Sequence, residues 1–181
     1  MEIVRKWKRR LTDESGSMFL EYVIGSLMFV VFVAFCLDLL GIAARHQLIG
    51  QEIGYIARIL SVQSGTTAET PHGFPGGERA YLTSSEILDR MEKVAKAAGF
   101  RDGEWELYVE ETDANGNVVQ SGVLTDKSNF QCDYLNKISV QFRGSYRWGN
   151  SAVSGIPGIH RKQQMNVERI VMAEYLRNYD G

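Results

Sequence analysis

The chain has 181 residues, of which 23% are charged, with a formal net charge of −2 and a mean hydropathy of −0.19. This length has room for one modest domain beyond a membrane segment. A pI near 5.9 leaves no strongly basic surface of the kind that binds nucleic acid, so nucleic-acid-binding proteins are excluded. The apolar residues concentrate between Met18 and Ala44, so the sequence predicts two parts, an apolar segment and a polar domain.

Residues 1–16 form a basic leader that ends in a glycine. Its basic residues are Arg5, Lys6, Lys8, Arg9 and Arg10. Gly16 and Ser17 follow, and Glu21 is a lone carboxylate at the beginning of the apolar segment.

The apolar segment is long enough to cross a bilayer. Between residues 18 and 44 the only charged side chains are Glu21 and Asp38. At ~1.5 Å per helical residue, about 20 residues span the ~30 Å hydrocarbon layer. Because Lys and Arg precede the segment, we expect a single-pass membrane protein, with its N-terminus in the cytoplasm and its later domain outside.

An apolar segment near the N-terminus also occurs in signal peptides, lipoprotein signals and uncleaved anchors. A secretory signal peptide needs a small-x-small cleavage site, and Ile42-Ala43-Ala44 fits poorly. A lipoprotein signal needs a small residue before its cysteine, but Phe35 precedes Cys36. An uncleaved anchor accounts for the hydrophobicity and leaves the spacing of Gly16 and Glu21 unexplained, so this alternative stays open.

The helical period continues beyond the membrane segment. Apolar residues recur at Ile49, Ile53, Ile56, Ala57 and Leu60, the spacing of one helix face. We therefore predict a single helix over residues 17–62, transmembrane in its first half.

A linker and a short helix are expected next. Residues 63–84 are rich in Gly, Thr and Pro and predict an irregular linker. Residues 85–98 have the apolar spacing of a short amphipathic helix. Thr83 and Glu86 form a capping box at its start, and Gly99 ends it.

The rest of the chain has mainly the pattern of strands. Residues 105–110 alternate, and their acidic residues, with Glu111, are typical of the solvent face of an edge strand. Asn115-Gly116 predicts a turn, and Ile138 begins a third strand. Residues 161–175 fit a strand or a helix; we favour a strand, because its hairpin with the Ile138 strand completes a four-stranded antiparallel sheet. The predicted fold class is α+β, a long N-terminal transmembrane helix followed by an extracytoplasmic domain at residues 85–181, a small antiparallel sheet with one short helix.

No catalytic grouping is recognisable in the sequence. Phosphate loops, HExxH, CxxC and nucleophile-elbow motifs are missing. The histidines, His46, His72 and His160, have no metal-ligand spacing, and Asp113–Asn117 is only a fragment of a calcium loop. Cys36 and Cys132 are expected to stay unpaired. We therefore expect no enzyme, no cofactor, no metal and no small-molecule substrate.

The order of basic leader, Gly16, Glu21 and apolar helix resembles the type III signal of type IV pilin-like proteins, which prepilin peptidase cuts after the glycine. Gln51–Arg58 is similar to the Ala/Gly-rich segment ending in Arg of the minor pilins of the tight-adherence system, the TadE-like family. The resemblance also extends to single-pass proteins of Gram-positive conjugation or secretion gene sets, and it covers about a quarter of the chain.

The resemblance implies roles for three residues. Gly16 would precede the cut, Ser17 would be the new N-terminus, and Glu21 would pair with the N-terminal amine of a neighbouring subunit. The implied location is a bacterial cell membrane, and the implied partners are that membrane, prepilin peptidase and other pilin-like subunits, assembled into a surface fibre or a secretion pseudopilus. Major subunits of such fibres are usually shorter, so a minor subunit is expected.

Two rival functions belong to other classes. One is an uncleaved single-pass membrane adaptor of a conjugation or secretion apparatus, whose external domain binds a partner protein. The other, a membrane-tethered exported enzyme, has the least support from the sequence.

Overall fold

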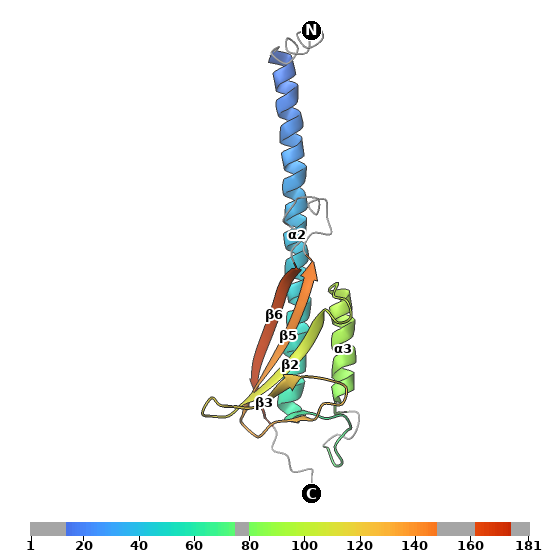
Figure 1. Cartoon of the computed structure of the whole chain (residues 1–181), viewed down its shortest axis with the longest axis vertical. Coiled ribbons are helices and arrows are strands. Elements are labelled where there is room, and N and C mark those ends of the chain that lie inside the picture. Colours follow the sequence, from blue (N-terminus) through green and yellow to red (C-terminus); the bar gives the residue numbers. More distant parts are fainter. Residues whose placement is uncertain (1–13, 75–79, 148–161, 175–181) are drawn as a thin grey trace. The chain divides into compact units, whose positions relative to one another are not determined.

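A computed structural model describes residues 14–74, 80–147 and 162–174 (Figure 1). Its elements are α2 (Glu14–Gln63), β1 (Gly65–Thr66), α3 (Ser84–Ala97), β2 (Trp105–Thr112), β3 (Val118–Val123), β4 (Phe130–Gln131), β5 (Lys137–Arg147) and β6 (Lys162–Met172). The basic residues of the leader lie outside the described residues. The structure is α+β, as predicted, with one long apolar N-terminal helix and antiparallel strands.

The chain divides into two compact units. The first contains α2 up to Gly41, and the second contains residues 42–147 and 162–181. We call the described part of the second unit, residues 42–74, 80–147 and 162–174, the sheet unit. In the first unit the helix is built mainly from Leu, Val and aromatic residues and contains no proline, so no residue there removes a backbone donor from the helix.

Four strands of the sheet unit form one antiparallel sheet in the order β3-β2-β5-β6. The predicted hairpin is confirmed, because Ile138 of β5 pairs with Val171 of β6. The predicted turn between β2 and β3 is also present, with Gly116 at a φ of +87°. A second, two-stranded sheet joins β1 to β4.

The prediction that residues 105–111 form an edge strand is wrong. β2 lies between β3 and β5, and the outermost strands of the sheet are β3 and β6. Alternation reports which residues of a strand face the core, but it does not report how many neighbours the strand has.

The two helices share a core with the sheet (Figure 1). The fully buried apolar side chains of this core include Ile49, Ile53, Ile56, Leu60, Ile87, Met91, Leu107, Ile138, Val140 and Phe142. Ser61 Oγ, in the last turns of α2, donates to the carbonyl oxygen of Met172 at 2.5 Å, and Glu174 N donates to Ser61 O at 2.9 Å. The second half of α2 is therefore a core helix, and each buried aliphatic side chain contributes about 1.5–3 kcal/mol.

Helix α3 begins and ends where its capping residues predict, within one residue. Glu86 N donates to Thr83 Oγ1 at 3.4 Å, and Thr83 N donates to Glu86 Oε2 at 2.9 Å, which completes the capping box. Gly99 follows the helix at a φ of +87°, the left-handed conformation that commonly ends a helix.

The segment after α2 is held by buried hydrogen bonds. Ser64 and Thr66 are fully buried. Thr66 Oγ1 donates to Leu82 O at 3.1 Å, and Ser64 O accepts from Cys132 N at 2.9 Å. Residues 64–67 thus connect the end of α2 to two distant parts of the sheet unit.

Gly65 is essential to this connection, and we expect Gly65→Ala to lower the free energy of unfolding by about 3 kcal/mol. Its φ is +118°, and a Cβ atom there would lie 2.1 Å from Phe130 O on the paired strand β4. Gly116→Ala is the matched control, because Gly116 also has a positive φ but has open space around it. Only the left-handed backbone conformation is then unfavourable, so the free energy of unfolding should fall by about 1 kcal/mol. Chemical unfolding of the detergent-extracted protein followed by circular dichroism measures both; equal losses would contradict the clash.

Candidate functional site

The three residues singled out by the sequence lie near the beginning of α2. Gly16 is within the first turn after Glu14, and Ser17 and Glu21 follow, both with exposed side chains. Because residues four apart on a helix are neighbours on one face, Ser17 and Glu21 share a face. The structure therefore places the predicted cleavage point and the predicted assembly carboxylate within two turns of each other.

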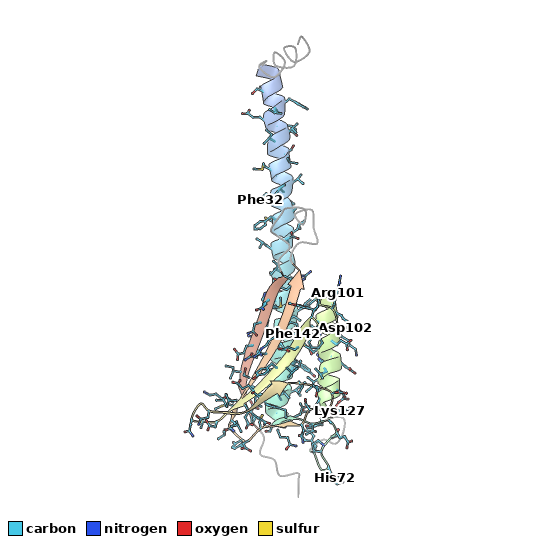
Figure 2. All side chains as sticks on the ribbon, in the orientation of Figure 1. Phe32, His72, Arg101, Asp102, Lys127 and Phe142 are labelled. Carbon is cyan, nitrogen blue, oxygen red and sulfur yellow. The ribbon has the colours of Figure 1, made fainter. Side chains whose placement is uncertain are left out.

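From Tyr22 to Leu37 the helix carries no charged residue and is apolar on all its faces. Large side chains from Met18 to Leu40 are exposed, among them Tyr22 at 75% and Phe32 at 62%, the latter labelled on α2 in Figure 2. A helix that is apolar all round normally lies in a core or a membrane. This helix is long and apolar enough to cross a membrane by length and composition.

Small and polar residues interrupt this surface and suit it to lipid or to other helices. A Cβ atom added at Gly25 or Gly41 would meet nothing within 4 Å. Ser26 Oγ donates to Val23 O of the same helix at 2.9 Å. A hydroxyl satisfied within its own helix is tolerated in lipid, and small residues allow neighbouring helices to approach closely.

An ion pair in the sheet unit joins the second half of α2 to α3. Arg90 Nε donates to Glu52 Oε1, and the guanidinium lies 3.9 Å from the centroid of the Tyr55 ring. The hydrogen bond to Glu52 is the main cause that raises the pKa of Arg90 above its usual value. Glu52 is only 8% exposed, and the guanidinium that pairs with it belongs to a residue 38 positions away in the chain.

A second buried carboxylate organises the far end of the sheet. Glu111 of β2 is 1% exposed. Its oxygens accept hydrogen bonds from Asp133 N at 2.8 Å, Asn136 Nδ2 at 2.8 Å and Gln120 Nε2 at 2.7 Å. The carboxylate therefore fastens the loop before β5 and the edge strand β3 to the middle of the sheet.

The expectation that Glu111 faces solvent is wrong, and the sequence held a signal against it. Glu111 is in phase with Leu107 and Val109, which are buried, whereas Glu106 and Glu110 occupy the alternate positions. The period of two assigns Glu111 to the core face.

We expect Glu111→Ala to lower the free energy of unfolding by about 3 kcal/mol, because it leaves three donors without their acceptor. Glu110→Ala is the control, since Glu110 lies on the same strand and faces the other side. Thermal or urea unfolding measures the difference. If Glu111→Ala lowers the free energy of unfolding no more than Glu110→Ala does, water replaces the carboxylate as the acceptor of these hydrogen bonds.

The open hollows on the surface of the sheet unit include two of similar volume. One, of about 390 Å³, is lined by Trp105, Arg143 and Asn166 among others. There the Arg143 guanidinium already lies 3.9 Å from the Tyr108 ring centroid and 3.9 Å from a Glu106 oxygen. The other, of about 380 Å³, lies beside the end of α2 and residues 80–82.

The histidines and cysteines of the chain lie apart. His46 is on α2 and His72 is in the loop before α3 (Figure 2), while His160 is outside the described residues. Within the described ranges, no three His, Cys, Asp or Glu side chains are placed to hold a metal ion. Cys36 belongs to the apolar part of α2, whereas Cys132 is buried in the sheet unit; both are thiols.

The exposed apolar part of α2, with Gly16, Ser17 and Glu21 at its beginning, is thus the candidate functional surface. Its residues suit insertion into lipid or packing against other helices, and Glu21 is the carboxylate predicted to take part in assembly. Comparison with known proteins adds no identification, because no protein-family model, no curated protein and no solved structure matches the chain.

Proposed function

We propose that the chain is a pilin-like subunit, a minor pilin or pseudopilin. In this proposal prepilin peptidase cuts it after Gly16, and the apolar part of α2 then assembles with other subunits into a surface fibre or a secretion pseudopilus. Before assembly, the same part of the helix holds the protein in the membrane.

The contrast between the two parts of α2 carries the proposal. Residues 49–60 bury their apolar stripe completely, whereas the large apolar side chains of residues 18–40 are exposed on every face. Exposing each such side chain to water costs about 1.5–3 kcal/mol, so this part of the helix requires a second environment. Lipid supplies it during insertion, and the helices of neighbouring subunits supply it after assembly.

Glu21 gives the proposed assembly its register. A lone charged group near the centre of an apolar bundle is costly, by roughly 3 kcal/mol on insertion scales. Cleavage after Gly16 creates an ammonium group at Ser17, and this cation on one subunit can neutralise Glu21 of the next. Because the pair is favourable at one axial offset only, it selects that offset between subunits.

The basic leader supports the proposed orientation. Its lysines and arginines precede the apolar part of α2, and such clusters remain on the cytoplasmic side of a membrane. The sheet unit would then lie outside the cytoplasm, attached to the fibre or to the membrane through α2.

The N-terminal residue and the intact mass of the membrane-extracted protein test the proposal. A chain that begins at Ser17 supports processing and assembly as a subunit. A chain from the native host that still begins at Met1 would overturn the proposal in favour of an uncleaved single-pass adaptor.

A further inference from the structure

Arg45 is a partly buried cation of the sheet unit. Its guanidinium carbon lies 5.3 Å from the centroid of the Tyr146 ring. That ring is only 7% exposed, and it packs edge-on against Phe100 with the two centroids 6.0 Å apart. A Cβ atom added at Gly99, just after α3, would lie 3.5 Å from a terminal nitrogen of Arg45. Groups from β5 and from the end of α3 therefore border the guanidinium.

The guanidinium of Arg45 has no anionic partner among the described residues. Across the described ranges, no carboxylate or carbonyl oxygen accepts a hydrogen bond from it. Asp102 pairs with Lys96 at 3.4 Å, and Glu104 Oε2 accepts from Arg101 N at 3.2 Å. A ring beside the flat face of a guanidinium leaves its N–H donors, which lie in the plane of the group, available to an acceptor. The site therefore suits an anion from outside the described part of the chain.

The position of Arg45 along α2 matches the headgroup layer of a membrane. About 20 helical residues cross the hydrocarbon layer, so a span that begins at Tyr22 ends at Gly41, with Asp38 as its only charged residue. The headgroup layer adds about 5–7 Å on each side, which is about four residues at ~1.5 Å each. Because α2 is continuous through this region, Arg45 would lie at the level of the lipid phosphates.

No spacer separates this level from the sheet unit. Ile49, one turn after Arg45, is already fully buried in the core. Insertion of residues 22–41 would therefore bring the end of the sheet unit that carries Arg45 and Gly99 against the headgroups. Arg101, labelled in Figure 2, is exposed two residues after Gly99 and adds a second cation near the end of α3.

We infer that the Arg45 guanidinium binds the phosphate of a phospholipid headgroup, in the leaflet on the side of the sheet unit. A phosphodiester supplies the anionic oxygens that the site lacks, and a guanidinium can bind two of them at once. The contact fixes the depth of α2 in the bilayer and holds the sheet unit against the membrane before assembly. The inference rests on the proposed function in one respect, since it requires α2 to be inserted in a membrane.

Solid-state NMR of the full chain in phosphatidylcholine vesicles tests this contact. With ¹³C in the guanidinium carbons of arginine, the ³¹P nuclei of the lipid attenuate the signal of any guanidinium that is hydrogen-bonded to phosphate, because N–O distances of about 2.8 Å bring carbon and phosphorus close together. Arg45→Lys keeps the cation but removes the labelled carbon. The difference between the natural and the Arg45→Lys chains therefore isolates Arg45, and this difference signal should lose most of its intensity.

Arg58→Lys is the matched control. Arg58 is also an exposed residue of α2, but it lies about 20 Å further along the helix, so its difference signal should keep its intensity. An Arg45 signal that ³¹P leaves unchanged would overturn the inference, as would equal attenuation of Arg45 and Arg58. If Arg45→Lys does not fold, Arg45→Gln gives the same difference signal.

Vesicles of a phosphate-free galactolipid, with inorganic phosphate in the buffer, distinguish the source of the phosphate. The Arg45 signal should keep its intensity there, because the bound group belongs to the lipid. Attenuation as strong as in phosphatidylcholine would identify a site for free phosphate and would refute the headgroup contact.

The N-terminal residue of chains purified from the native host separates the two proposals. An attenuated Arg45 signal from chains that begin at Met1 would support the headgroup contact and refute processing as a subunit. Chains that begin at Ser17 and show no attenuation would support processing and refute the headgroup contact.

Discussion

A chain carrying Gly16→Leu is expected to keep its leader and to accumulate in the membrane with Met1 as its first residue. In the proposed function the peptidase cuts beside Gly16, and a branched side chain next to the scissile bond would obstruct the approach of the catalytic groups. A misplacement of about 1 Å at a reacting bond costs on the order of 100-fold in rate. Intact mass of the membrane-extracted protein should show the cleaved fraction falling at least about tenfold.

Gly25→Leu is the matched control for this experiment. Gly25 lies on the same helix, and a Cβ atom there meets nothing within 4 Å. The control chain should therefore be cut as efficiently as the natural one. Ser17 as the first residue of the Gly16→Leu chain would contradict cleavage after Gly16.

Glu21→Gln is expected to leave processing and membrane insertion intact while abolishing incorporation into fibres. The amide keeps the size of the side chain but removes the charge that neutralises the neighbouring N-terminal ammonium. Removing one partner of a buried ion pair costs about 3–5 kcal/mol, and 3 kcal/mol corresponds to a more than 100-fold weaker contact. Sheared surface fractions, probed for the subunit, measure the loss.

Glu92→Gln provides the same chemical change outside the proposed assembly surface. Glu92 is a partly exposed residue of α3 paired with Lys96, so its replacement should leave the amount of assembled subunit unchanged. Equal incorporation of the Glu21→Gln and Glu92→Gln chains would show that Glu21 does not direct assembly.

The parts of the fold with local signals were predictable from the sequence. The ends of α3 follow from Thr83, Glu86 and Gly99, because capping depends on residues within one turn of the helix. The turn at Gly116 depends on one glycine conformation. The β5-β6 hairpin followed from the need to complete a sheet, although the pattern of residues 161–175 also fitted a helix.

Features that depend on distant residues were not predictable in the same way. The central position of β2 results from its pairing with β5, about 30 residues later in the chain. The burial of Glu52 depends on Arg90, and nothing in the local sequence identifies that partner. Glu111 was the exception, since its phase along the strand already indicated the core.

The candidate site was predicted almost entirely from spacing. Gly16, Ser17 and Glu21 are recognised by their order before an apolar run, and the structure adds that they lie in the first turns of a continuous helix. What the sequence did not reveal was which strands lie at the edges of the sheet, because an edge exists only once the order of the strands is known.

The bonds between Ser61 and the end of β6 have a mechanical consequence. They close a loop of 111 residues, so the helix by which the sheet unit is attached is fastened to the last strand of that unit. A tensile load entering through α2 would reach the first and last elements of the sheet unit at the same moment. Under load, this part of the protein should rupture in a single step instead of unravelling from one end.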